Sequence, residues 1–323
     1  MQQNDLTKSL VEAFLYLAPQ EGLYPTHISN ITLMRVDHST QPVAVLQEPS
    51  IVLVIQGVKR AYIGKDIFKF QQGQCLFISI AIPFDCDTLV EREPMLAIAI
   101  KFEPQMMAEL ATKMDKEQRP LIEDFDNKEI KLSCGLNIIE MNSVISDVAL
   151  RLLNLLRSKQ DTAILGEQVK RELIYRVLQA GGSDFIQNLS AIMSRSGVIY
   201  TICEIIQRDY YRNLTVQELA KQAGMSVSLF HQAFKKVTNY SPLQYIKITR
   251  LHKARDLILN NQMGVAEAAY EVGYVSASQF SREFKRLFGV PPKLSTNESK
   301  STRLKYKPNM EHINESSDNH ENC

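Results

Sequence analysis

A duplicated segment near the C-terminal end is the strongest constraint on the fold of this chain. The stretch VQELAKQAGMSVSLFHQAFKK, from Val216, recurs as VAEAAYEVGYVSASQFSREFKR, from Val265. Matching positions lie 49 residues apart up to the glycine and, after a one-residue insertion, 50 apart beyond it. The matched pairs are Glu218 and Glu267, Ala220 and Ala269, Gly224 and Gly273, Phe230 and Phe280, Phe234 and Phe284, Lys235 and Lys285, Lys236 and Arg286, and Pro242 and Pro292. Apolar, small, glycine and basic positions in register indicate one structural unit used twice.

Each copy predicts a helix-turn-helix. Gly224 and Gly273 stand where a first helix ends and a left-handed residue costs least. Ser226 and Ser276 then cap a second helix. The phenylalanine pairs of the second helices are spaced i and i+4, so we expect them to face the core.

The opposite face of each second helix is polar. It carries Ser228, His231, Gln232 and Lys235 in the first copy, and Ser278, Gln279, Ser281, Arg282 and Lys285 in the second. Hydrogen-bonding side chains on the early turns and cations on the last turn suit a helix that enters the major groove of DNA. A plain solvated surface is the alternative for one copy, but two copies in register favour the groove.

The charge of the chain supports the same interpretation. Residues 201–300 hold 14 Lys and Arg against 8 Asp and Glu, which gives +6. Residues 1–200 hold 20 against 24, which gives −4, and the tail 301–323 holds 3 against 4, which gives −1. The positive excess therefore lies on the duplicated segment, as expected for a part that faces nucleic acid.

The duplicated segment resembles the DNA-binding domain of AraC/XylS-type bacterial transcription regulators. The resemblance covers about 194–293 and rests on LTVQELAKQAGMSVSLFHQAFKKVTNYSPLQYI, RLHKARDLIL and EVGYVSASQFSREFKRLFGVPP. Upstream, PTHISNITLMRVD, PSIVLVIQGVKRAYIG and LFISIAIPFD are similar to the regulatory domain of one AraC-type subgroup. The resemblance implies a cupin-like barrel that senses an effector or dimerises, and a double helix-turn-helix that binds promoter DNA.

The resemblance also implies contact residues. Base-reading positions fall on Ser228, His231 and Gln232 in the first unit and on Ser278, Gln279 and Arg282 in the second. Positions near phosphates are Thr215, Ser226, Lys235, Lys236, Ser276, Lys285 and Arg286. Relatives often carry Arg where His231 or Gln232 stands, which leaves the base preference of the first unit open. Glutamine pairs best with adenine and arginine with guanine.

The fold class is predicted as α+β. Six short strand patterns between Ile51 and Phe102, separated by turn residues, indicate a small antiparallel barrel or sandwich. Stripes of apolar residues at helical spacing predict helices over 136–156 and 164–180, the second ended by Gly181 and Gly182. These helices either form a dimer face or pack on the barrel. We expect a cupin-like regulatory domain at 1–110, a helical linker at 111–193, the paired helix-turn-helix domain at 194–293 and a disordered tail at 294–323.

The connector LQYIKITRLHKARDLIL, 243–259, has helical spacing and no Gly or Pro. As a helix this stretch would span roughly 26 Å. Successive major grooves on one face of DNA are about 34 Å apart. One monomer is therefore expected to contact two adjacent grooves and to bend the duplex.

The sequence supplies little chemistry for an enzyme. Only His27 and His38 lie near the barrel strands, which argues against the metal site of a cupin enzyme, and no nucleophile set, phosphate loop or cofactor motif is found. Two other classes stay open: a cupin enzyme with an accessory DNA-binding part, and an architectural DNA-binding protein. Cys75 is expected to be a buried thiol, and Asp85 and Asp87 are expected to raise the pKa of the Cys86 thiol between them.

The expected function is therefore a sequence-specific transcription regulator with no enzymatic activity. Activator is the expected class, but the residues themselves do not distinguish activation from repression. Its expected partners are double-stranded promoter DNA, RNA polymerase, an unidentified small effector and a second copy of the chain. An odd count of five cysteines, no leader pattern and apolar runs too short for a bilayer predict a cytoplasmic location, at the nucleoid when DNA is bound.

Overall fold

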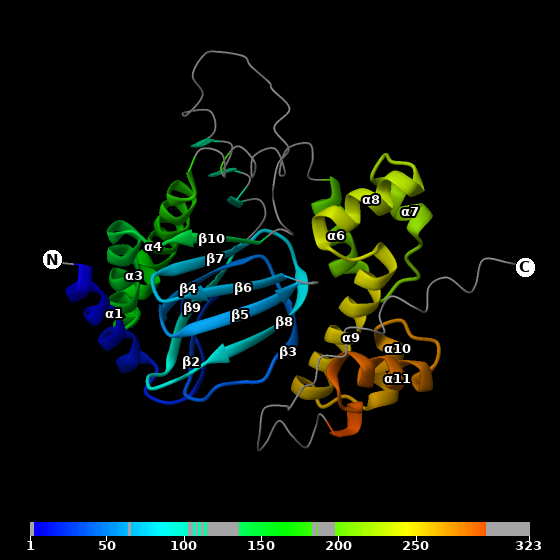
Figure 1. Cartoon of the computed structure of the whole chain (residues 1–323), viewed down its shortest axis with the longest axis horizontal. Coiled ribbons are helices and arrows are strands. Elements are labelled where there is room, and N and C mark those ends of the chain that lie inside the picture. Colours follow the sequence, from blue (N-terminus) through cyan, green and yellow to red (C-terminus); the bar gives the residue numbers. More distant parts are fainter. Residues whose placement is uncertain are drawn as a thin grey trace, which may run out of the picture.

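The computed structural model of the protein describes residues 3–63, 66–102, 106–107, 109–110, 113–114, 136–182, 186 and 198–294. A two-sheet sandwich with three helices on one side forms the N-terminal part, and a cluster of helices forms the C-terminal part (Figure 1). The predicted tail, 294–323, lies outside the described residues except for Leu294.

The sandwich consists of two antiparallel sheets. One has the strand order β1-β2-β9-β4-β7-β10 and the other the order β3-β8-β5-β6. The strands are β1 (Gly22–Pro25), β2 (Ile31–Val36), β3 (Val43–Gln47), β4 (Ser50–Gln56), β5 (Val58–Ile63), β6 (Asp66–Gln71), β7 (Gln74–Ile78), β8 (Ile82–Leu89), β9 (Met95–Lys101) and β10 (Leu136–Glu140). Because the two sheets stay separate among the described strands, the cupin-like fold is confirmed as an open sandwich rather than a closed barrel.

The larger sheet is a middle layer with both faces covered. On β4, Ile51 and Leu53 face a core shared with the helices α1 (Gln3–Leu17), α3 (Ser143–Leu155) and α4 (Lys159–Ala180). Val52 and Val54 face the core between the two sheets. Burial on both faces explains why β4 is a continuous apolar run instead of an alternating one.

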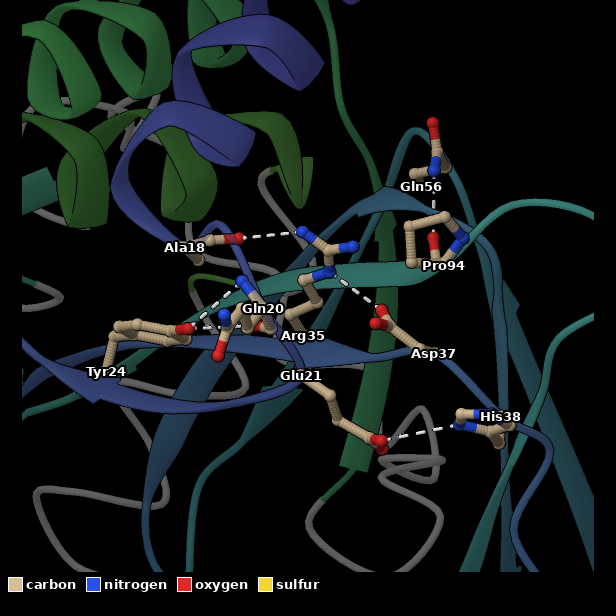
Figure 2. A network of polar contacts seen from close by, with 9 residues as sticks. All are labelled: Ala18, Gln20, Glu21, Tyr24, Arg35, Asp37, His38, Gln56 and Pro94. Carbon is tan, nitrogen blue, oxygen red and sulfur yellow. Dashed lines mark hydrogen bonds and ion pairs between the residues drawn. The ribbon is translucent and has the colours of Figure 1, made fainter.

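The C-terminal end of α1 is tied to the first strands by polar contacts (Figure 2). Arg35 of β2 donates from Nη1 to the carbonyl oxygen of Ala18 at 3.1 Å and from Nε to Oδ1 of Asp37 at 2.7 Å. The Tyr24 hydroxyl donates to the carbonyl oxygen of Gln20 at 2.9 Å. These bonds fix the chain where it passes from α1 into the sheet.

The predicted strands are confirmed, and the sequence missed others. All six patterns between residues 51 and 102 form strands, β4 to β9. The strands β1, β2 and β3 precede them and were not predicted. The helix predicted over 136–156 is wrong at its start, because Leu136–Glu140 forms β10 and α3 begins at Ser143.

The physical reason for this difference is the open edge of β7. Antiparallel pairing of β10 with β7, with Ile138 opposite Leu76, satisfies backbone groups along that edge. Ile138 then stays 37% exposed instead of joining a helical stripe. The helix prediction over 164–180 is confirmed within α4, whose C-cap is Gly181. Since β10, α3 and α4 share the core of the sandwich, these helices pack on it, and the boundary at residue 110 stays a prediction.

The described part of the C-terminal region contains the helices α6 to α11. They are α6 (Val198–Asp209), α7 (Val216–Gln222), α8 (Val227–Thr238), α9 (Pro242–Asn260), α10 (Val265–Glu271) and α11 (Ala277–Phe288). The connector is helical as predicted and extends one residue further at each end, since α9 spans 19 residues with a Ser241 capping box at its start. One apolar core lies around α7 and α8 and a second around α10 and α11.

Candidate nucleic-acid interface

The first helix-turn-helix is α7, a tight turn and α8. Gly224 has φ +65°, in the left-handed region, and ends the first helix. The Ser226 side chain accepts a hydrogen bond from the backbone N–H of Leu229, which caps α8. Phe230 and Phe234 are fully buried. The predicted turn, cap and core positions of this unit are confirmed.

The second unit, α10, turn and α11, has the same design. Gly273 has φ +87°, and the Ser276 side chain accepts from the backbone N–H of Gln279. Phe280 and Phe284 are fully buried, and Gly289 ends α11 in the left-handed region. Two recognition helices, α8 and α11, are thus built by equivalent residues.

The predicted base-reading side chains lie on the outer faces of these helices. His231 is half-buried, and the other five, Ser228, Gln232, Ser278, Gln279 and Arg282, are exposed. All six come from the first two turns, the part of a recognition helix that reaches base edges. Their contacts with bases stay a prediction.

The predicted phosphate-contacting residues are all exposed, namely Thr215, Ser226, Lys235, Lys236, Ser276, Lys285 and Arg286. The four cations occupy the last turns of α8 and α11. The three hydroxyls cap the helices α7, α8 and α11. They therefore cap the helix N-termini, and the backbone N–H groups of a helix's first turn can donate to an anion.

A carboxylate that sequence reasoning missed lies beside the second recognition face. Glu283 accepts hydrogen bonds from the Gln279 amide at 3.2 Å and from the Tyr274 hydroxyl at 2.7 Å. Lys247 of α9 lies 3.3 Å from the same carboxylate. Burial, followed by the Glu283 hydrogen bond, raises the pKa of Tyr274, so its hydroxyl stays a donor. Glu283 thus orients Gln279 and ties α11 to α9.

The two units are joined through Arg250 of α9. Its guanidinium donates to three backbone carbonyl oxygens, those of Tyr210 at 2.7 Å, Arg212 at 2.6 Å and Gly273 at 3.2 Å. The first two lie between α6 and α7, and the third lies in the turn of the second unit. One side chain thereby fixes the second unit relative to the first. No local sequence motif predicts this role of Arg250.

The N-terminal sandwich lies beside the C-terminal helices (Figure 1). Strands β3 and β8 contact α9, and β3 also contacts α11. The buried Tyr245 hydroxyl of α9 donates to the carbonyl oxygen of Ala81 at 2.6 Å, and burial raises the pKa of Tyr245 well above its usual value. Near the other end of α9, Arg255 donates to the carbonyl oxygen of Ala44 on β3 at 3.3 Å. The sandwich therefore contacts both ends of the helix that connects the two units.

Two buried titratable groups occupy matching places in the helices that precede the two units. Cys203 of α6 and His252 of α9 lie 49 residues apart, which is the offset of the repeat. Burial raises the pKa of the Cys203 thiol to about 12. Burial, with smaller contributions from Arg255 and Lys253, lowers the pKa of His252 to about 3, and its ring packs edge-on against Phe288.

Possible metal-ligating side chains are dispersed among the described residues of the sandwich. No group of three or more His, Cys, Asp and Glu side chains is placed to hold a metal ion there, and His38 lies 3.4 Å from Glu21 (Figure 2). Cys75 and Cys86 are both buried. Burial is the largest cause of the raised pKa of Cys86, and Asp85 and Asp87 add to it as expected. Within the described ranges, no helix has the length and apolar character needed to cross a membrane.

Comparison with known families decides the affiliation. Residues 27–184 match the family described as "AraC-type transcriptional regulator N-terminus", and residues 219–295 match a "Helix-turn-helix domain". The chain belongs to the AraC-type family of DNA-binding transcriptional regulators. The AraC-type match spans the strands of the sandwich from β2 onward together with α3 and α4, and the second match spans most of both helix-turn-helix units.

Individual relatives match parts of this AraC-type protein. The Msm operon regulatory protein of Streptococcus mutans is 31% identical over 31% of this chain and 36% of its own. The virulence regulon transcriptional activator VirF of Yersinia enterocolitica is 23% identical over 49% of this chain and 58% of its own. The matches thus span about a third to three fifths of these two relatives.

Solved structures of ToxT from Vibrio cholerae share the fold. A ToxT variant in its apo form has a TM-score of 0.59 at 12% identity, and the match covers 84% of this chain and 99% of its own. Wild-type ToxT with a bound unsaturated fatty acid has a TM-score of 0.56 at 11% identity, over 85% and 97% of the two chains. The arrangement of sandwich and paired helix-turn-helix units is therefore shared with these proteins.

Proposed function

We propose that one monomer of this AraC-type protein binds promoter DNA by placing α8 and α11 in two successive major grooves. The observation that carries the proposal is the pair of equivalent recognition helices, held at a fixed relative position by Arg250. The residues predicted to read bases lie on the outer faces of both helices, and all of them except the half-buried His231 are exposed. Cations on the last turns supply the phosphate attraction.

We further propose that a small molecule bound by the sandwich controls DNA binding through α9. The sandwich contacts α9 near both ends, through Tyr245 and Arg255. A ligand that shifts Ala44 or Ala81 would therefore change the helix that sets the distance between the two units. A structure of ToxT holds an unsaturated fatty acid, which makes such a fatty acid the first effector to test.

The remaining partners are proposals of the same kind. We propose that the protein acts in the cytoplasm, at the nucleoid when it binds DNA, and that it has no enzymatic activity. We propose that it activates transcription, as the name of VirF states for that relative, and that it contacts RNA polymerase. We also propose that two chains pair on DNA.

The bending of the duplex also stays a prediction. The connecting helix α9 contains 19 residues. At the rise of an α-helix its length would be about 29 Å. Successive major grooves on one face of straight DNA lie about 34 Å apart. The duplex is therefore expected to bend toward the protein so that both recognition helices can enter their grooves.

Selection from random duplexes with the full-length protein tests the DNA-binding proposal. We expect an enriched motif of two blocks about 10 base pairs apart. Gln232→Ala should relax the first block and Arg282→Ala the second, each costing about 1–3 kcal/mol at its own position. Lys285→Ala should weaken binding to all sites and lower the salt dependence, whereas Lys69→Ala, the same charge change on strand β6, should do neither. An unenriched pool would contradict the proposal.

The effector proposal is tested on the selected site by gel shift with and without oleate. We expect oleate to change the affinity of the wild-type protein. Tyr245→Phe, which removes the hydroxyl that bonds Ala81, should reduce that change. Tyr211→Phe, a matched loss of a hydroxyl from an exposed ring, should leave it intact. Equal responses of both variants would argue against control through α9.

A further inference from the structure

Leu229 is an exposed apolar residue in the first turn of α8, outside the set of residues expected to read bases. The residue is 53% exposed, while the neighbouring Phe230 is fully buried and supplies the core contact of this turn. Its backbone N–H is bonded to the Ser226 side chain at 3.3 Å, so its position at the start of the helix is fixed. Packing within the unit therefore does not account for a leucine here.

The repeat gives this position a counterpart. Gln279 stands 50 residues later, at the same place in α11 relative to the capping serine, and is also exposed. The two recognition helices thus present different chemistry from one geometry, an amide in α11 and a branched alkyl group in α8. An amide can pair with a base edge, whereas a leucine side chain can neither donate nor accept a hydrogen bond.

We propose that Leu229 packs against the C5-methyl group of a thymine in the major groove that α8 enters, and so determines specificity at that base pair. The thymine methyl is the apolar group that the base edges present in the major groove. The first turn of α8 is the part of the helix expected to reach those edges. This inference rests on the proposed function, because it requires α8 to enter a groove.

The neighbouring residues of α8 are consistent with this placement. Ser228 and Gln232 are exposed beside Leu229, as is Lys236 on the last turn. The polar pair would flank the methyl contact with hydrogen bonds, and Lys236 would lie toward the phosphates. Leu229 thereby adds an apolar contact to the surface of α8, for which the sequence predicted only polar base-reading residues.

Replacement of single thymines by deoxyuridine, which removes only the C5-methyl, tests the inference in the selected site. Burial of one methyl-sized group corresponds to about a fourfold change in affinity. We expect the full-length wild type to lose about fourfold at one thymine of the block bound by α8. Leu229→Ala should bind the thymine and deoxyuridine sites equally, and Leu229→Gln should shift the preference there toward adenine.

Leu165→Ala is the matched control, since Leu165 is 47% exposed on α4 in the N-terminal part. This variant should keep the wild-type response to deoxyuridine. The inference is overturned if the wild type binds every substituted site as tightly as the parent, or if Leu229→Ala keeps the wild-type loss. Either result would make Leu229 a surface residue or a contact for another protein. Failure to select any site would instead count against the proposed function itself.

Discussion

The two helix-turn-helix units share one scaffold but differ in how firmly their turns are built into the rest of the protein. A Cβ atom added at Gly224 would meet no atom within 4 Å beyond the glycine itself and its two chain neighbours. The same atom at Gly273 would lie 2.5 Å from the carbonyl oxygen of Tyr211 and 3.2 Å from the Arg250 guanidinium. The first turn is open, whereas the second is docked against the loop between α6 and α7. The second unit is therefore positioned by the first.

The helix caps also differ between the two units, and here the first unit has the additional bond. Thr215 caps α7 with its side chain, which accepts from the backbone N–H of Glu218. Gly264 stands at the matching place before α10 and makes no side-chain cap. The second unit thus depends more on contacts with α9 and the first unit, and the first depends more on its own local bonds.

The largest effect is expected from alanine at Gly273, with Gly224→Ala as its matched comparison. Both glycines have positive φ. Each substitution therefore carries a strain of about 1–2 kcal/mol. Gly273→Ala adds a clash with a backbone oxygen, and we expect a total loss of about 3 kcal/mol or more in the free energy of unfolding. Gly224→Ala should lose only the strain. Denaturant unfolding of the two variants measures both, and equal losses would break the comparison.

Arg250→Lys should have the next largest effect. A lysine cannot reach the carbonyl oxygens of Tyr210, Arg212 and Gly273 as the guanidinium fork does. We therefore expect a loss of about 2 kcal/mol in stability. The two units should also become less fixed relative to each other. Binding to duplexes whose half-sites are moved apart by one base pair should therefore improve relative to the parent site. Unchanged spacing preference would show that Arg250 does not set the geometry.

The helices that precede the two units, α6 and α9, carry buried groups that should lower the stability of the protein at opposite ends of the pH scale. Buried His252 has a pKa of about 3 in the fold against an ordinary value of 6.5, so the unfolded chain binds the proton first as the pH falls. Stability should decline below pH 6.5 by up to about 1.4 kcal/mol per pH unit. The Cys203 thiol, with a pKa raised from 9.0 to about 12, should cost stability as the pH rises above 9.

The variants His252→Leu and Cys203→Val separate the loss of stability at low pH from the loss at high pH. Thermal unfolding across the pH range should show a flatter acid side for the first variant and a flatter alkaline side for the second. An acid limb that persists in His252→Leu would mean that other groups dominate it.

The smallest effect is expected at the missing cap. Gly264 has φ −61° and ψ 142°, as an N-cap residue should, and a Cβ there would make only ordinary contacts with Glu267. Gly264→Ser should therefore stabilise the protein by a few tenths of a kcal/mol, while Thr215→Gly should destabilise it by a similar amount. The midpoint of urea unfolding measures both effects: it should be higher than that of the wild type for Gly264→Ser and lower for Thr215→Gly.

Local patterns in the sequence predicted the parts of the structure that local forces determine. Gly224, Ser226 and the phenylalanine pairs specify a turn, a cap and a core through their own neighbours, and the structure places them as predicted. Short strands bounded by turn residues were found for the same reason.

Contacts between distant segments were not predictable in this way. The pairing of β10 with β7 depends on an open edge much earlier in the chain, and helical spacing around Ile145 concealed the strand. Arg250 and Tyr245 look like ordinary residues of an amphipathic helix, yet their partners are backbone carbonyls of remote segments. A backbone oxygen carries no residue-specific signal, so such contacts leave no trace in the sequence pattern.

Hydroxyl-radical footprinting of the full-length protein on a selected duplex, at a concentration where one chain binds one site, tests the central claim most directly. Two equivalent helices, held by α9 and Arg250, should protect two patches about one helical turn apart on the same face of the DNA. Arg282→Ala should weaken only the patch of α11. A single protected patch from one bound chain would contradict the account.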